Sequence, residues 1–188
     1  MRLSSLRPEH RGQVSELLIA TAAFSSEEVE VALELFDETY PRCRPERSAR
    51  PRAERREGPA FANDEMADYE FLGAFDVGDR LLGYACFGPT PSTDGTWDLY
   101  WLAVHPAAQG RGAGRALVRE VEQILVARQG RLLAVETSSR ESYAHSREFY
   151  ARCGYTEAAR VRDFYGPADD RIILTTRLMA RPVGVATR

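Results

Sequence analysis

The chain has 188 residues, of which 44% are hydrophobic, and a net charge of −3, which predicts one globular domain with a well-buried core. All 25 basic residues are arginines, so the lack of lysine excludes Schiff-base chemistry, lysine nucleophiles and the Walker A phosphate loop. The acidic balance argues against a dedicated nucleic-acid binder, and the uncharged stretch at residues 17–26 is too short to span a bilayer.

The cysteines and histidines indicate neither a disulfide framework nor a metal site. Cys43, Cys86 and Cys153 are widely spaced and odd in number, which is typical of reduced thiols. The histidines form no pair with the spacing of metal ligands. Residues 1–12 contain no apolar segment of the kind found in a secretory signal, so we expect a cytoplasmic protein without a metal.

The first part of the chain predicts a strand followed by two helices. Residues 2–8 are expected to form the strand, and from Pro8 onward apolar residues recur at the spacing of a helix. A second helix is expected from Ser26, a candidate N-cap, and Pro41 lies just past its end.

An arginine- and proline-rich segment interrupts this pattern. Residues 41–59 contain seven arginines, three glutamates and four prolines, and they offer almost nothing to bury. Because no second core precedes it, the segment at 41–60 is expected to be a mobile loop within the domain.

The remainder of the chain predicts strands and helices in alternation. The expected strands are 69–77, 80–88, 96–104, 131–137, 156–164 and 171–178, and the expected helices are one that Gly130 stops as a C-terminal cap and one over 142–153. The order is then β-α-α-β-β-β-α-β-α-β-β. It predicts one α/β domain with a mixed sheet over residues 1–180, followed by a short tail at 181–188.

A glycine-rich loop joins the strand ending at Val104 to the helix after it. Gly110, Gly112 and Gly114 alternate along the loop, so it does not match the G-x-G-x-x-G pattern of dinucleotide folds. Glycine permits positive φ and close approach to a ligand, and N–H groups at a helix start favour an anion. On this loop alone, a phosphate cradle and a turn without a ligand both remain open.

Two motifs resemble one family. Residues Gln109–Gly114 resemble the acetyl-CoA signature Q/R-x-x-G-x-G/A of the GNAT-type N-acetyltransferase superfamily, and the preceding strand ends in A-V-H-P. Residues 149–155, FYARCGY, are similar to the family's Y-x-x-x-G-F/Y. The resemblance runs from about Arg2 to Leu178 and includes a bacterial subgroup of unassigned acceptor. It implies the GNAT fold, with a largely antiparallel mixed sheet flanked by helices.

The resemblance also implies acetyl transfer from acetyl-CoA to a primary amine by direct attack. The loop amides would hold the CoA pyrophosphate, the strand before them would pair with the pantetheine arm, and Tyr150 would protonate the CoA thiolate. A phenol of pKa about 10 suits a thiol of about 8.5. The expected co-substrate contacts are Leu102, Ala103, Val104, Gln109, Gly110, Arg111, Gly112, Ala113, Gly114 and Arg115.

One position departs from the family. Many members have an asparagine that touches the pantetheine seven residues before the tyrosine, where this chain has Tyr143. Ser138, Ser139 and Ser142 are the candidates to replace that contact.

Acetyl transfer requires a neutral amine, so a carboxylate is expected to accept its proton. Asp98, expected to share a strand face with Tyr100 and Leu102, and Glu136 are the candidates for this base. A purely structural carboxylate fits each position as well.

The acceptor side combines aromatic residues with the carboxylates Asp163, Asp169 and Asp170. Aromatic faces beside carboxylates suit a cationic or amphipathic amine, although core packing explains many of these rings equally well. The expected acceptor contacts are Trp97, Tyr100, Trp101, Phe164 and Tyr165.

Two other functions stay open. One is a CoA-binding regulatory module that has lost turnover, and the other is a nucleic-acid-associated protein that uses residues 41–60. The identity of the acceptor and the choice between monomer and homodimer are also left open.

Overall fold

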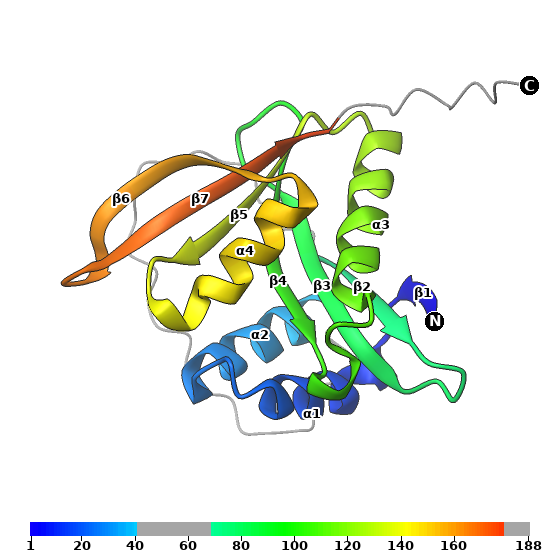
Figure 1. Cartoon of the computed structure of the whole chain (residues 1–188). Helices are drawn as coiled ribbons and strands as arrows, with labels where there is room; N and C mark the ends of the chain where they lie inside the picture. Colours follow the sequence, from blue (N-terminus) through cyan, green and yellow to red (C-terminus); the bar gives the residue numbers. More distant parts are fainter. Residues whose placement is uncertain (41–68, 179–188) are drawn as a thin grey trace, which may run out of the picture.

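The computed structural model describes residues 1–40 and 69–178, so the expected loop at 41–60 and the tail at 181–188 lie outside the described residues. The described residues form a seven-stranded sheet with helices on both faces (Figure 1). The elements follow one another in the predicted order, and the α/β class is confirmed.

The sheet is mixed and almost entirely antiparallel. Its order is β1-β2-β3-β4-β5-β7-β6, and only β4 and β5 are parallel neighbours. The strands are β1 (Arg2–Ser5), β2 (Glu70–Phe75), β3 (Leu81–Pro89), β4 (Thr96–Val104), β5 (Leu132–Ser138), β6 (Thr156–Gly166) and β7 (Asp169–Arg177). The α-helices are α1 (Arg11–Thr21), α2 (Ser26–Thr39), α3 (Ala113–Ala127) and α4 (Ala144–Cys153).

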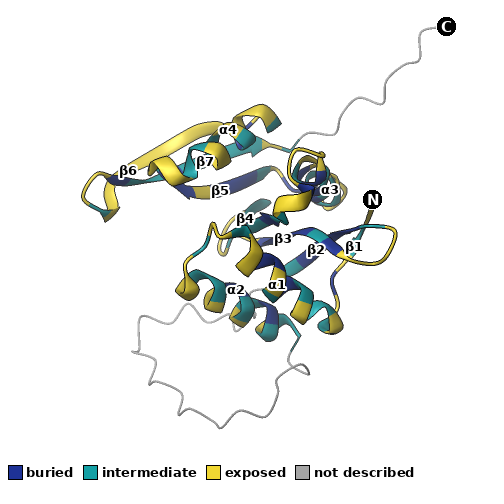
Figure 2. Ribbon diagram, turned by 60° about the horizontal axis from the view of Figure 1, so that its bottom comes forward, coloured by how far each residue is buried: buried dark blue, intermediate teal, exposed yellow. Residues whose placement is uncertain are grey.

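Each face of the sheet has its own hydrophobic core. Helices α1 and α2 cover one face, where Leu17 and Phe36 pack with Tyr84 of β3. Helix α3 covers the other face through Leu117 and Val121, and α4 lies on the same side (Figure 2). The buried positions of α3 follow the predicted helical spacing, so the apolar pattern dictates which face this helix turns to the sheet.

Strands β4 and β5 pair at one end and then separate. Residues 96–98 of β4 pair with residues 132–134 of β5. Beyond them, β4 pairs with β3 alone, and β5 continues beside β7. The edge of β4 from residue 99 onward therefore has no neighbouring strand on the β5 side within the described residues, which is the opening that pantetheine pairing was expected to need.

A β-bulge in β4 changes the face that its side chains occupy. Leu99 and Trp101 lie opposite successive residues of β3, so Tyr100 is the extra residue of the bulge. Leu102 consequently packs toward the same core as Leu99. Strict alternation places Leu102 on the face of Asp98, and that expectation is wrong because the bulge shifts the alternation by one residue.

The helix ends differ from the predictions by one position each. The N-cap of α2 is Ser25 rather than Ser26: its hydroxyl accepts the N–H of Glu28 at 3.2 Å, and the Glu28 carboxylate accepts the N–H of Ser25 at 2.7 Å. Only Ser25 has a glutamate three residues later, so only it completes a capping box. At the end of α3, Gln129 rather than Gly130 takes positive φ, 63°, and the N–H of Gly130 donates to a carbonyl of the last turn at 2.8 Å.

Strand β6 forms one edge of the sheet and has almost no cover. Its residues are exposed from Thr156 to Tyr165 (Figure 2). Arg160, Arg162 and Asp163 place charges along this edge, which disfavours its pairing with another strand.

Candidate active site

A large pocket opens where β4 and β5 separate. Its volume is about 980 Å³, at the upper end of the roughly 300–1,000 Å³ typical of small-molecule sites. Its walls come from the α1–α2 connection, β4, the glycine loop, the start of α3, β5 and α4. Segments far apart in the sequence therefore meet in one cavity.

Two of the three loop glycines adopt backbone conformations that favour glycine. Gly110 and Gly112 have φ of 72° and 86°, and no atom lies within 4 Å of where a Cβ would stand. Gly112 is the N-cap of α3 and offers no side chain to its first N–H groups. Gly114 differs, because a Cβ there would lie 3.4 Å from Phe149 and Val104, so it permits close packing. The loop thus leaves open space beside its backbone at Gly110 and Gly112.

The glycine loop is fixed to the end of β4 by a side chain. Gln109 Nε2 donates to the carbonyl oxygen of Val104 at 3.1 Å. His105 Nδ1 accepts the N–H of Ala107 at 3.2 Å in the turn before the loop. These contacts set the position of the loop relative to the strand edge that borders the pocket.

Most of the expected co-substrate contacts lie in the pocket wall. Of the ten, only Arg111 is absent from the lining residues that the described chain provides. Arg115, one of these ten residues, lies in the first turn of α3, and Arg152 from α4 also lines the pocket. Guanidinium groups suit phosphate oxygens.

Tyr150 lies in the pocket wall and is anchored in the core. Its ring packs against Phe149 and Tyr155, with centroids 5.2 and 5.4 Å away. Burial raises the pKa of the Tyr150 phenol well above its usual value of about 10. The phenol therefore keeps its proton at neutral and moderately alkaline pH.

The structure adds Thr137, which sequence reasoning missed. Its hydroxyl is buried at the pocket wall and has no hydrogen-bond partner within residues 1–40 and 69–178. The candidates Ser138 and Ser139 are already engaged, since Ser138 donates to Asp169 and Ser139 accepts the N–H of Asp170. Three consecutive polar residues at a strand end signal this region, but their spacing does not tell which hydroxyl stays free.

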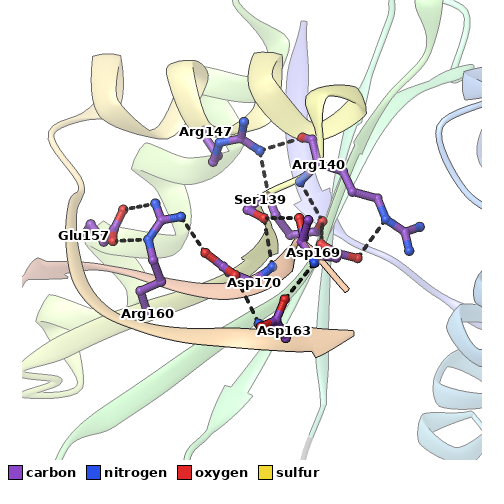
Figure 3. A network of polar contacts seen from close by, with 10 residues as sticks. Ser139, Arg140, Arg147, Glu157, Arg160, Asp163, Asp169 and Asp170 are labelled. Atoms are coloured by element: carbon purple, nitrogen blue, oxygen red, sulfur yellow. Dashed lines mark hydrogen bonds and ion pairs between the residues drawn. The ribbon is translucent and has the colours of Figure 1, made fainter. Parts of the chain in front are cut away.

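A polar network holds the chain between β5 and α4 (Figure 3). The buried carboxylate of Asp169 accepts the Ser138 hydroxyl and pairs with Arg140 at 2.8 Å. Arg147 donates to the carbonyl oxygens of Ser138 and Arg140 at 2.7 and 2.8 Å (Figure 3). The network joins the start of β7 to one wall of the pocket.

The carboxylates of Asp163 and Asp170 make their contacts within the β6–β7 hairpin. Asp170 pairs with Arg160 at 3.0 Å and accepts the N–H of Asp163 (Figure 3). Asp163 accepts the N–H of Ala168 at 2.7 Å. Of the three aspartates considered for the acceptor, only Asp169 lines the pocket.

The two candidate bases occupy different places. Glu136 lines the pocket and forms an ion pair with Arg171, whose guanidinium lies 4.9 Å from the centroid of the Phe164 ring. Asp98 lies outside the lining residues of the described chain, and it accepts the Thr90 hydroxyl at 2.6 Å. The β4 bulge separates Asp98 from the part of the strand that faces the opening.

The expected acceptor aromatics also divide into two groups. Tyr100, Trp101 and Tyr165 line the pocket, and burial, aided by the charge of nearby carboxylates, raises the pKa of Tyr100 to about 12. Trp97 instead packs in the α3-side core, and Phe164, which contacts Tyr165 edge to face, is not among the pocket-lining residues of the described chain.

Two further contacts join lining residues that no sequence pattern groups together. The Tyr143 hydroxyl donates to Glu28 Oε1 at 3.1 Å, and the rings of Phe24 and Trp101 lie 6.0 Å apart. The available signal was the capping box that contains Glu28. It places the residue at a helix start but not opposite a side chain 115 positions away.

Two features are absent from residues 1–40 and 69–178. They contain no group of three or more His, Cys, Asp or Glu side chains arranged to hold a metal ion. None of their helices has both the length and the apolar character that crossing a membrane requires.

Comparisons with known proteins point to one family. A profile described as the Acetyltransferase (GNAT) family matches residues 29–155. A crystal structure described as an acetyltransferase of the GNAT family, from Desulfovibrio desulfuricans, is 36% identical, with a TM-score of 0.78 over 95% of this chain and 99% of that one.

Two more distant structures share the fold. An aminoglycoside 6'-N-acetyltransferase complexed with coenzyme A is 18% identical, with a TM-score of 0.65 over 97% of this chain and 99% of that one. The ribosomal-protein-S18-alanine N-acetyltransferase from Escherichia coli is also 18% identical, with a TM-score of 0.66 over 99% of both chains.

Proposed function

The chain belongs to the GNAT family of acetyltransferases, and on that premise we propose that it moves an acetyl group from acetyl-CoA to a primary amine, with Tyr150 as general acid. The observation that carries the proposal is one pocket bordered by the glycine loop, the free edge of β4 and Tyr150. Acetyl-CoA supplies an acetyl group already activated as a thioester.

The pocket fits this co-substrate on two independent features. The open space beside Gly110 and Gly112 lets a pyrophosphate approach the N–H groups at the start of α3, where the helix dipole favours an anion. The unpaired edge of β4 leaves backbone donors and acceptors for a chain of amides such as the pantetheine arm. Buried Thr137 adds a hydroxyl without a partner among the described residues.

The proposed reaction is direct attack of the amine nitrogen on the thioester carbon. A backbone N–H at the free edge of β4 polarises the thioester oxygen, and Tyr150 gives its proton to the sulfur as the carbon–sulfur bond breaks. Tyr150, like any phenol, is protonated at neutral pH, and burial raises its pKa further. Most of the rate comes from holding amine and thioester together, which supplies roughly 7–11 kcal/mol in well-oriented reactions.

We propose Glu136 as the carboxylate that accepts the amine proton. It is the candidate base that lines the pocket, and it lies on β5 just beyond the point where β4 and β5 separate. Its ion pair with Arg171 fixes the carboxylate beside the opening. A Glu136→Gln variant is expected to lose kcat/KM mainly at the acidic end of the pH profile, and an unchanged profile contradicts the assignment.

The identity of the acceptor amine depends on the side chains of the pocket rather than on the fold. The two distant relatives act, by name, on an aminoglycoside and on an alanine of a ribosomal protein, so one fold accepts very different amines.

We place the protein in the cytoplasm, where the free thiols of Cys86 and Cys153 fit a reducing environment.

Release of free CoA thiol tests the proposed function. Purified protein with acetyl-CoA is screened against amino acids, polyamines, aminoglycosides and peptides, and acetylated product is identified by mass. Amine-dependent thiol release with stoichiometric product supports the proposal. Tight CoA binding without turnover on any amine favours the regulatory module instead, and salt-sensitive binding of RNA or DNA favours the nucleic-acid alternative.

A further inference from the structure

Glu28 differs from the other carboxylates of the pocket. Among residues 1–40 and 69–178, three carboxylates line the pocket, and two of them have an arginine partner: Glu136 pairs with Arg171, and Asp169 pairs with Arg140 at 2.8 Å. Glu28 forms no ion pair within the described parts of the chain, where it accepts hydrogen bonds from neutral donors. The negative charge of Glu28 is therefore the one that protein cations do not balance there.

The carboxylate of Glu28 is held in place. Oε2 accepts the backbone N–H of Ser25 at 2.7 Å, and Oε1 accepts the hydroxyl of Tyr143 at 3.1 Å. Glu28 also lies in the first turn of α2, where the helix dipole favours an anion. The bond from Tyr143 joins α2 to the segment that precedes α4. The Glu28 carboxylate is therefore held from both sides, by Ser25 and by Tyr143.

Two aromatic rings in contact line the same pocket as this charge. Phe24 directly precedes the N-cap Ser25, and its ring lies 6.0 Å from the ring of Trp101 on β4. Both rings line the pocket together with Glu28 and Tyr143. A fixed carboxylate and two flat, largely apolar rings in the wall of one pocket are complementary to an ammonium group attached to an apolar, preferably planar, body.

We propose that Glu28 binds the ammonium group of the acceptor and that Phe24 and Trp101 hold an apolar or aromatic part of the same molecule. Tyr143 is the positioning residue, because its hydroxyl orients the carboxylate. The inference rests on the proposed function, since it assigns the substrate class of that pocket: a primary amine joined to a flat apolar group.

The test measures binding without requiring turnover. The full chain, saturated with CoA, is titrated with 2-phenylethylamine and with its uncharged analogue 2-phenylethanol, and the fluorescence of the two tryptophans reports binding. We expect the amine to bind about 10- to 100-fold more tightly than the alcohol, as a hydrogen-bonded charge pair would give.

Glu28→Gln is the decisive variant. Glutamine keeps the capping box when its single amide oxygen accepts the Ser25 N–H, and its amide NH2 can then donate to the Tyr143 hydroxyl oxygen, so the fold survives while the charge is lost. The preference for amine over alcohol is expected to vanish. Glu27→Gln is the matched control, because it removes the same charge from the same helix turn at an exposed position outside the pocket wall, and it should keep the preference.

Tyr143→Phe tests the positioning role. It leaves the charge and the ring but removes the hydrogen bond, and the amine preference is expected to fall about three- to tenfold while alcohol binding stays unchanged. A structural role alone would weaken both ligands equally.

The outcomes separate this inference from the proposed function. Equal binding of amine and alcohol by the unmodified protein, or an amine preference that Glu28→Gln retains, overturns the inference. Loss of the preference in Glu28→Gln alone supports it, even if no amine in the thiol-release screen is acetylated, which would overturn the proposed function.

Discussion

The two ends of the pocket differ in the groups that line them, main-chain groups at one end and side chains at the other. The end proposed for acetyl-CoA uses main-chain groups: the glycine loop, the first turn of α3 and the free edge of β4. The end proposed for the amine uses side chains from three separate elements, namely Glu28, Trp101 and Tyr143. A backbone site depends on chain path and tolerates many side chains, whereas a side-chain site changes with each substitution. The co-substrate is therefore expected to be the constant part of this enzyme and the acceptor the variable part.

The largest expected effect falls where the two ends meet, at Tyr150. Tyr150→Phe should lower kcat about 100-fold or more with every acceptor and leave both KM values nearly unchanged, because it removes the proposed proton donor. Steady-state thiol release measures this. Tyr155→Phe is the matched control, since it deletes a hydroxyl from a buried ring outside the pocket wall and should keep kcat. If the fall in kcat of Tyr150→Phe differed from one acceptor to another, the division of the pocket into a co-substrate end and an acceptor end would be contradicted.

The next effect is on stability and is confined to one end. Asp169→Ala removes the buried partner of Arg140 and Ser138, and we expect the free energy of unfolding to fall by about 2–3 kcal/mol. Urea denaturation measures the fall. Because the network holds the segment before Tyr143, KM for the amine should rise while KM for acetyl-CoA stays constant. A parallel rise of both KM values would show that the ends are not independent.

A smaller effect is expected at the glycine loop. Gly112→Ala forces alanine into a φ of 86° and places a methyl group in the open space, so KM for acetyl-CoA should rise about tenfold with every acceptor. Gly95→Ala provides the control, because Gly95 also has positive φ, 70°, but lies outside the pocket wall. It should lose stability without a change in KM. Acceptor-selective loss in Gly112→Ala would contradict a purely co-substrate role.

The smallest effect is a pH dependence that both ends share. Burial raises the pKa of Tyr150, and burial with nearby carboxylates raises that of Tyr100 to about 12. The unfolded chain then releases these protons first, so stability is complete below about pH 10 and falls above it, by up to about 1.4 kcal/mol per pH unit for each such tyrosine.

Denaturation between pH 8 and 11 measures this slope. The chain has no lysine, so the groups that titrate in this range are its tyrosines, its cysteines and the α-amino group. Tyr150→Phe should reduce the slope, and an unchanged slope would mean that the Tyr150 phenol ionises as readily in the folded as in the unfolded chain.

The sequence predicted the element order and the backbone end of the pocket because both are encoded locally. Helical spacing in α3 and the alternating glycines each occupy one continuous stretch, so their physical meaning can be read without knowing the fold. The order of elements then places β4 next to a parallel strand. The same reasoning failed at Tyr100, where one extra residue reverses the alternation and only pairing with β3 reveals it.

The acceptor end could not be predicted in this way. Glu28 and Tyr143 meet only because α2 and the segment before α4 border the same opening, and no pattern in either segment specifies the other. Aromatic character alone selected Trp97, which packs in the α3-side core, and Phe164, which is half exposed and lies outside the pocket lining of the described residues. It passed over Phe24, whose neighbours in sequence resemble an ordinary helix start.

The separation of β4 from β5 also has a consequence in time. Amides on the β5 side of residues 99–104 lack a partner strand within the described chain, so they should exchange their hydrogens with solvent far faster than the amides that β4 directs toward β3. A bound ligand that carries amide groups would slow the hydrogen exchange of these β4 amides and leave the amides directed toward β3 unchanged. The exchange pattern of β4 would thus record, residue by residue, how far into the sheet a ligand reaches and how long it stays.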